Sequence, residues 1–512
     1  MNSLPLLTLM IVVPLVGAVV VTVLPSGSAR LVKPIALGTS LVTLALAILA
    51  WARFDSGATE QFQLAEVHSW IPQFGVSYAL GVDGIALSLI VLSAILTPIC
   101  LLAAWNDVSD EEASREKTYF ALMLVLLAFM VGVFAATDVF LFYVFFEAML
   151  IPVYFLIGLF GGARRQYAAM KFLLFSLAGG LIMLVAVIAL YVAGPGGPDG
   201  FLVESLTGNL DASTGALRWM FVGFFFAFAV KAPMWPVHTW LPDAATEARP
   251  ATAVLLVGVL DKVGTYGMIR FCLQLFPEAS KWATPVVITL AVISVIYGAL
   301  LAIGQTDMMR LIAFTSISHF GLIVLGIFAL TSVGGAGATL YMINHGFSTA
   351  GLFLLAGFLV ARRGSKRIPD YGGWQRVTPV LAGSFLVVGL SSLALPGLST
   401  FVSEFLVLQG AFMRYPAAAV IATLGTVLAA LYILLMYQRL MTGRTPSFVE
   451  GEVPRDLSAR ERWVVAPIIA SFVVLGFFPK PVLDLVNPAV DRTLQFVGVT
   501  DPAATTASGS EK

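Results

Sequence analysis

The sequence of 512 residues carries very little charge. Aspartate, glutamate, lysine and arginine together make up 11% of the chain, whereas soluble globular proteins carry roughly 25%. Hydrophobic residues make up 59% of the chain. The formal net charge is +0, so the composition gives no reason to expect a nucleic-acid partner. This balance is typical of a protein that crosses a membrane many times.

Cysteine is almost absent. Cys100 and Cys272 are the only two cysteines, and they are too far apart to form a CxxC motif. The sequence therefore gives no support for disulfides, zinc or iron–sulfur ligation, and both thiols are expected to be small core residues. No GxGxxG stretch opens a helix, and neither a Walker loop nor HExxH occurs. No soluble catalytic domain is predicted.

Apolar runs of about 18 or more residues recur from end to end and predict about fourteen membrane-spanning helices. No basic segment precedes the first run and no A-x-A site follows it, so it is expected to be a retained helix rather than a signal peptide. The predicted spans lie near residues 4–24, 32–52, 81–104, 117–135, 137–160, 166–193, 216–241, 249–275, 282–304, 310–330, 336–361, 377–412, 416–440 and 463–485.

Two of these spans are interrupted by proline. Pro233 and Pro236 break the span 216–241, and Pro396 with Gly397 breaks the span 377–412. Backbone groups freed by such a break are tolerated in a membrane only where protein or water satisfies them. Breaks at corresponding places in two halves of a transporter point to an ion or substrate site, although proline kinks made for packing are the alternative.

The distribution of basic residues predicts the orientation of the chain. Most of the 29 lysines and arginines lie in the inward loops if the N-terminus is placed outside, and inward loops are the ones enriched in these residues. Both termini are therefore expected to face out. The stretch 53–80 alternates polar and apolar residues and predicts a small external hairpin. The tail after Asp501 is small and polar, and is expected to be flexible.

Several ionisable residues lie in the middle of predicted spans. A charge at the centre of a spanning helix costs about 2.5–3.5 kcal/mol, so each of them needs a reason to be there. They could pair to hold helices together, but interhelical polar contacts average only about 0.6 kcal/mol. Acid, base and imidazole groups at one depth instead suit proton transfer, because burial and neighbouring charges move their pKa values toward neutrality. The candidates are Glu147, Lys231, Lys262, His319, His345 and Glu404, with Asp138 and Asp261 as weaker ones.

At these residues the sequence resembles the antiporter-like membrane chains of respiratory complex I. The resemblance covers roughly residues 1–490, and its motifs are specific to that superfamily. Within the family, Glu404 is typical of the branch that carries glutamate on the second broken helix, where sibling chains carry lysine. The segments that carry the resemblance are TDVFLFYVFFEAMLIPVYFLIG (137–158), KAPMWPVHTWLPDAATEA (231–248), VLDKVGTYGMIRF (259–271), QTDMMRLIAFTSISHFG (305–321), INHGFSTAGLFLLAG (343–357) and LPGLSTFVSEF (395–405).

The resemblance implies an all-α polytopic membrane protein of fourteen helices, with two inverted five-helix repeats made of helices 4–8 and 9–13. Helices 7 and 12 would be the broken ones. The implied organisation is residues 1–116 for helices 1–3 with the hairpin near 53–80, 117–275 for the first repeat, 282–441 for the second, 442–490 for helix 14 and 491–512 for a flexible tail.

The resemblance also implies a role for each candidate residue. Glu147 would pair with Lys231 on the first broken helix, and Lys262 would connect the two halves. His319 and His345 would pass protons toward Glu404, the terminal site. The chain would be a translocase subunit of an NADH–quinone oxidoreductase in a bacterial inner membrane and would do no redox chemistry itself.

The same resemblance implies the partners and cofactors of the chain. Flavin mononucleotide, iron–sulfur clusters and quinone would be bound by other subunits, and this chain would hold no cofactor or metal. Its partners would be lipids and the other membrane-arm subunits, including the sibling antiporter-like chains L and N.

Three positions depart from the family pattern. Ala245 stands where histidine is frequent, Met309 replaces a frequent lysine, and Asp261 precedes Lys262 where an apolar residue is common. Adjacent helical residues point about 100° apart, so Asp261 need not pair with Lys262.

Two other functions remain open from the sequence. A subunit of a multi-chain sodium/proton antiporter or of a membrane-bound hydrogenase would use a related chain. A scaffold in which the charges only hold helices together is the third possibility.

Overall fold

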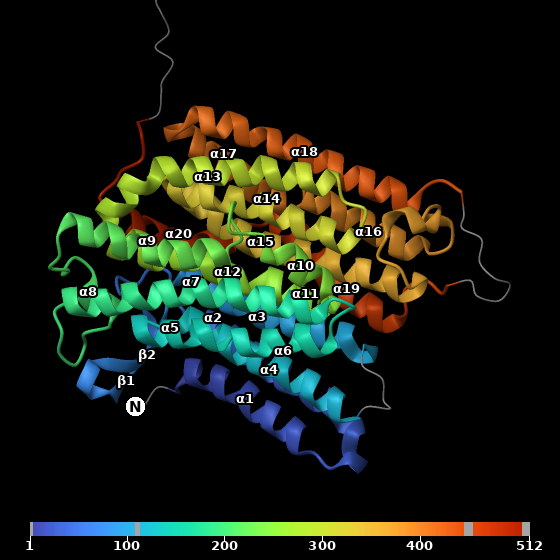
Figure 1. Cartoon of the computed structure of the whole chain (residues 1–512), viewed down its shortest axis with the longest axis horizontal. Coiled ribbons are helices and arrows are strands. Elements are labelled where there is room, and N and C mark those ends of the chain that lie inside the picture. The colour runs from blue at the N-terminus through green and yellow to red at the C-terminus, as the bar shows by residue number, and fades with distance from the viewer. Residues whose placement is uncertain (1–3, 108–112, 445–453, 504–512) are drawn as a thin grey trace, which may run out of the picture.

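The structure is a computed structural model, and it describes residues 4–107, 113–444 and 454–503. Long helices lie side by side along one direction and form a single bundle (Figure 1). Within the described ranges, 12 helices are long and apolar enough to cross a membrane, or up to 13 if the bent pair α19 and α20 is one span. The prediction of a helical protein that crosses the membrane many times is therefore confirmed.

The bounds of the elements follow the predicted spans closely. The helices are α1 (Leu6–Val23), α2 (Val32–Arg53), α3 (Gly84–Ala103), α4 (Ala113–Ala135), α5 (Val139–Ala148), α6 (Leu150–Phe160), α7 (Arg165–Ala193), α8 (Val203–Leu206), α9 (Thr214–Lys231), α10 (Trp240–Glu247), α11 (Pro250–Leu255), α12 (Lys262–Gly267), α13 (Pro277–Ile303), α14 (Met308–Phe328), α15 (Ser332–Arg363), α16 (Pro379–Ser392), α17 (Ser399–Arg414), α18 (Pro416–Met441), α19 (Ala459–Phe477) and α20 (Lys480–Val497).

The predicted hairpin is present. Strand β1 (Gln63–Ile71) pairs antiparallel with β2 (Val76–Val82). Gly75 closes the turn at φ +63°, in the left-handed region, and a Cβ there would overlap the carbonyl oxygen of Gly197. Glu66 of β1 accepts a hydrogen bond from the backbone N–H of Leu7 at 2.9 Å, which fixes the start of α1 against the sheet.

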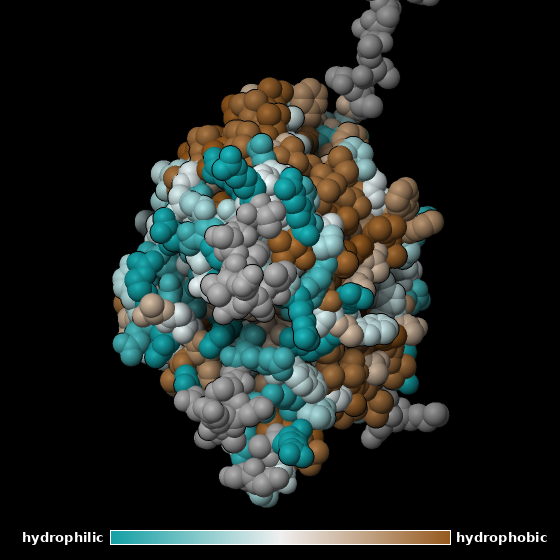
Figure 2. Space-filling model, turned by 90° about the vertical axis from the view of Figure 1, so that its right-hand side faces the viewer, coloured by the Kyte–Doolittle hydropathy of each residue, from teal (hydrophilic) through white to brown (hydrophobic). Residues whose placement is uncertain are grey.

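The bundle has a fully buried centre and an apolar exterior. Almost every residue of the spans Pro250–Leu273 and Met308–Phe328 is buried, and most of Ser332–Arg363 is buried as well. Outer helices such as α7 and α18 expose valine, leucine and isoleucine, as helices in contact with lipid do. Figure 2 looks onto the right-hand end of the bundle, where hydrophilic side chains gather while brown apolar surface lies along the sides. This pattern places the membrane normal along the bundle.

Both predicted interruptions are present. Helix α9 ends at Lys231, and the chain passes Pro233 and a cis bond before Pro236 to reach α10. Helix α16 ends at Ser392 and α17 begins at Ser399, with the left-handed Gly397 (φ +92°) between them. Since α16 has 14 residues and α17 has 16, neither is long enough to be counted as a span alone.

A further irregularity was not predicted. The span Pro250–Leu273 contains two π-helical segments, η5 (Leu256–Leu260) and η6 (Met268–Leu273), on either side of the short α12. A π-helical segment shifts the hydrogen-bond register and is frequent at functional sites. The sequence has no proline inside this span to indicate it.

The C-terminal prediction is wrong in its bounds. The predicted span 463–485 ends instead at Phe477, and α20 continues at a bend of 69°. Helix α20 reaches Val497, so residues 491–497 belong to a helix and not to a flexible tail. The reason is that α20 is amphipathic: it buries Val486 and Val490 while its charged residues stay on the outside, so it lies on the bundle.

Candidate functional site

The centre of the candidate site joins α12 to α15. Lys262 is wholly buried, and its Nζ lies 2.8 Å from Nδ1 of His345. The same Nζ donates to the carbonyl oxygen of Val257 at 2.6 Å, and Val257 belongs to the π-helical segment η5. It also lies 5.0 Å from the ring centroid of Phe320, within cation–π distance. Lys262 of α12 is thus in direct contact with His345 of α15, one of the two predicted histidines.

The two predicted histidines are neighbours. The rings of His345 and His319 meet edge to face, with centroids 5.3 Å apart. The other nitrogen of His345, Nε2, lies 3.1 Å from the hydroxyl of Thr349, and Nε2 of His319 lies 3.2 Å from the hydroxyl of Tyr432. A lysine, two imidazoles and a phenol therefore follow one another from α12 to α18.

Glu404 lies at the end of this row. One carboxylate oxygen, Oε2, accepts a hydrogen bond from the hydroxyl of Tyr341 at 3.3 Å, and Oε1 accepts one from Thr426. The ring of Tyr341 also lies 5.8 Å from that of His319. Sequence reasoning missed Tyr341 and Tyr432, although tyrosines inside two apolar spans were a visible signal.

Lys231 and Glu147 lie apart from this row, on α9 and α5. Lys231 is the last residue of α9 and is wholly buried, with its Nζ 4.7 Å from the ring centroid of Phe146. The Glu147 carboxylate fills the space above Gly180 of α7, where a Cβ would overlap it. Oε1 of Glu147 and Nζ of Lys231 have no hydrogen-bond partner among the described residues. No hydrogen bond or ion pair joins these two side chains in the part of the chain that the structure describes.

The two weaker candidates have different surroundings. Asp138 caps α5 by accepting from the N–H groups of Phe140 and Leu141, both at 2.9 Å, and also accepts from Ser77 of β2. This is a structural role. Asp261 is wholly buried beside Lys262, and neither carboxylate oxygen has a hydrogen-bond partner in the described part of the chain.

Sequence reasoning also missed a charged cluster at α10. Asp243 accepts from Lys171 of α7 and from Arg310 of α14, each at 2.6 Å. Arg310 is the cation left in the motif where Met309 replaces a lysine, and Met309 itself is buried. Ala245, the third departure, is buried on the same short helix.

His238 is a further missed residue. It precedes α10 and is 3% exposed, and its Nδ1 has no partner among the described residues. The histidine lies in the broken span, close to Lys231 in sequence, and that position was the available signal.

The fold and this row of groups define a class: a polytopic helical membrane protein with a buried polar axis across its centre. Residues 136–429 match the family model described as NADH:quinone oxidoreductase/Mrp antiporter, TM. Residues 58–133 match that of NADH-ubiquinone oxidoreductase chain 4, amino terminus.

Individual relatives narrow this class. NADH-quinone oxidoreductase subunit M of Mycobacterium tuberculosis is 51% identical, over 99% of this chain and 97% of its own length. A chain of respiratory complex I from Thermus thermophilus with bound NADH superposes with a TM-score of 0.87 at 30% identity, covering 96% of this chain and 100% of that one. A chain of the Mrp complex from Dietzia has a TM-score of 0.85 at 22% identity, covering 96% and 99%. The chain belongs to the subunit M family of NADH-quinone oxidoreductase.

Proposed function

We propose that this chain moves protons along its buried axis while the NADH–quinone oxidoreductase to which it belongs reduces quinone. Membership of the family makes the chain a membrane-arm subunit of that translocase. The observation that carries the proposal is the row of exchangeable groups from Lys262 to Glu404. Lys262 Nζ lies 2.8 Å from His345, the rings of His345 and His319 have centroids 5.3 Å apart, the rings of His319 and Tyr341 have centroids 5.8 Å apart, and Tyr341 donates to Glu404 at 3.3 Å. Groups of this kind inside a membrane mark proton paths.

The roles follow from the surroundings of each group. Glu147 and Lys231 take up the proton in the first half of the chain. A change in the distance between them alters how firmly Lys231 holds its proton, because a nearby carboxylate favours the charged form of a lysine. Lys262 receives the proton at the centre, and His345 and His319 pass it on. Glu404, held by Tyr341 and Thr426, is the terminal site.

The architecture proposed with this function has fourteen spans, in which α16 and α17 together form one broken helix. The spans 4–8 and 9–13 form two inverted repeats. The chain sits in a bacterial inner membrane with both termini on the outer side. Flavin mononucleotide, iron–sulfur clusters and quinone are bound by other subunits, and the sibling chains L and N are among the neighbours.

Sealed membrane vesicles containing the assembled complex test the proposal. Lys231→Ala and Glu147→Ala are expected to leave assembly intact and to lower coupled NADH–quinone activity and proton uptake by about a hundredfold, the lower end for loss of a positioned proton-transfer group. Lys281→Ala and Glu278→Gln, which alter an exposed ion pair on α13, are the matched controls. Full proton uptake by an assembled Lys231→Ala complex would contradict the proposal.

The sodium/proton antiporter alternative has less support. The Mrp chain is 22% identical, and a similarity this low supports a shared fold but not a shared function. Proton uptake driven by NADH in the vesicles, insensitive to added sodium, is the outcome that separates the two functions.

A further inference from the structure

Asp261 is a buried acid that the path proposed above does not use. It is 0% exposed, and neither of its carboxylate oxygens has a hydrogen-bond partner among the described residues. Burying a carboxylate without partners costs far more than burying a hydrogen-bonded one. Its place in the middle of a buried span therefore calls for a physical reason.

The packing of α12 shows which way Asp261 faces. Gly264 lies directly on the end of α9: a Cβ there would be 2.5 Å from the backbone N of Ala232 and 2.5 Å from the carbonyl oxygen of Phe228. Residues three apart on a helix share a face, so Asp261 lies on the same side as Gly264. That side meets the end of α9, where Lys231 is the last residue.

The Lys262 side chain faces α14 and α15. Its ammonium group meets His345 of α15 and the ring of Phe320 of α14, on the side of the second half. The two neighbouring residues thus face different helices, which agrees with the step of about 100° between adjacent helical residues.

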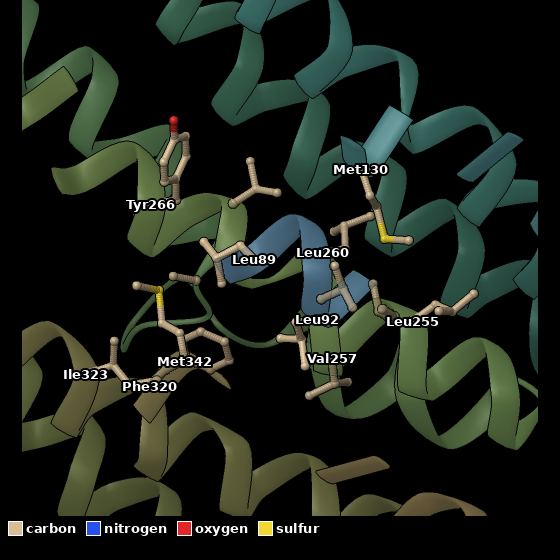
Figure 3. Close-up of a cluster of buried hydrophobic side chains, with 14 of the residues drawn as sticks. Leu89, Leu92, Met130, Leu255, Val257, Leu260, Tyr266, Phe320, Ile323 and Met342 are labelled. Carbon is tan, nitrogen blue, oxygen red and sulfur yellow. The ribbon is translucent and has the colours of Figure 1, made fainter. Parts of the chain in front are cut away.

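Apolar residues close to Asp261 in the chain are buried, among them Leu260 and Val263 at 0% exposure. Leu260 and Tyr266 of the same span pack in the buried cluster of leucine, methionine and phenylalanine side chains drawn in Figure 3. The hydroxyl of Tyr266 donates to the carbonyl oxygen of Phe134 at 3.0 Å. The charged groups that act on Asp261 through space are Lys262 and Lys231.

We infer that Asp261 is a proton-carrying site between Lys231 and Lys262. The Asp261 carboxylate takes a proton from the Lys231 ammonium group, which leaves a neutral acid and a neutral amine. The acid then gives the proton to the neutral amine of Lys262 and becomes a carboxylate again. No ion pair joins Asp261 to either lysine in the described residues, so each transfer crosses a gap that a water molecule or a change of lysine rotamer bridges.

This inference rests on the proposed function, and it differs from a fixed negative charge that only neutralises the lysines. A fixed charge stays ionised throughout turnover. A proton-carrying acid is protonated in part of the cycle, and a protonated carboxylic acid has a carbonyl stretching band in the infrared that a carboxylate lacks.

The experiment uses the complete complex, reconstituted in sealed vesicles, with Asp261→Asn, Asp261→Glu and the surface control Asp484→Asn. Proton uptake per NADH and the infrared difference spectrum on adding NADH are measured. Asp261→Asn is expected to lower proton uptake about tenfold or more, since a positioned proton-transfer group contributes about 10²–10⁴-fold to its step. Asp261→Glu is expected to retain uptake and to shift the carbonyl band.

The following results would overturn the role of Asp261 as a proton carrier. Uptake by Asp261→Asn equal to that of Asp484→Asn, or a carbonyl band unchanged in both Asp261 variants, overturns the inference. If Asp261→Asn does not assemble, the band in Asp261→Glu decides alone. Loss of uptake in Lys231→Ala together with normal uptake in Asp261→Asn rejects only the role of Asp261, whereas normal uptake in Lys231→Ala rejects the proposed function.

Discussion

Replacing Gly264 by alanine should push the end of α9 away from α12. The added Cβ would lie 2.5 Å from backbone atoms of Ala232 and Phe228, whereas ordinary contact begins at 3.4 Å. The end of α9 must therefore move by about 0.9 Å, and Lys231 moves with it. Neither contact is with a flexible side chain that could turn away.

The size of the effect follows from that displacement. Overpacking of a buried site costs about 1–3 kcal/mol, and a misplacement of about 1 Å can slow a positioned transfer by about 10²-fold. We expect Gly264→Ala to lower proton uptake by about tenfold or more and to lower the melting temperature of the complex.

Gly383→Ala is the matched control, because Gly383 of α16 has no atom within 4 Å of an added Cβ. In that helix alanine should be neutral or more stable by about 0.5–1 kcal/mol. Vesicle proton uptake and thermal melting are measured for both variants. If Gly264→Ala behaves like Gly383→Ala in both assays, the close packing of α12 on α9 is not what positions Lys231, and the reasoning is refuted.

Two other predictions concern groups around the axis. Arg270→Met leaves Asp83 buried without its cation and should destabilise the complex by about 3–5 kcal/mol. The loss would be measured as a smaller yield of assembled complex and a lower melting temperature. The double variant with Asp83→Asn should recover much of the lost stability, and no recovery would contradict the ion-pair explanation. Tyr432→Phe removes the hydroxyl beside His319. Loss of this hydrogen bond, with a free energy of about 0.5–1.5 kcal/mol, should lower proton uptake about two- to tenfold and leave the assembly of the complex unchanged. Tyr437→Phe on the same helix is its control, and equal rates in the two variants would exclude Tyr432 from the path.

The sequence predicted the features that depend on local chemistry. Apolar length predicted the spans, proline predicted the breaks after Lys231 and Ser392, and alternation predicted the hairpin. Charges in apolar runs identified the groups that line the axis. Each of these signals is contained within a few neighbouring residues, so one sequence is enough to detect it.

Features set by contacts between distant segments were not predictable in this way. The π-helical segments on either side of α12 lie in a buried span, and neither contains a proline that would have indicated it. The hydrogen bond from Tyr341 to Glu404 joins residues 63 positions apart. The direction of Asp261 depended on Gly264 meeting α9, a contact that no local pattern reports. The bounds of α20 were missed because an amphipathic surface helix lacks the continuous apolar run that marks a span.

The position of α20 has a consequence for how the chain is made. Its Arg492 donates to the carbonyl oxygens of Glu60 and Thr59, in the loop that leads into the hairpin. The hairpin leaves the ribosome well before α20, which is the last helix of the described residues. This end of the bundle can therefore close only after α20 has been made, and a chain that stops before Lys480 would lack the contacts from Arg492 to the loop before the hairpin.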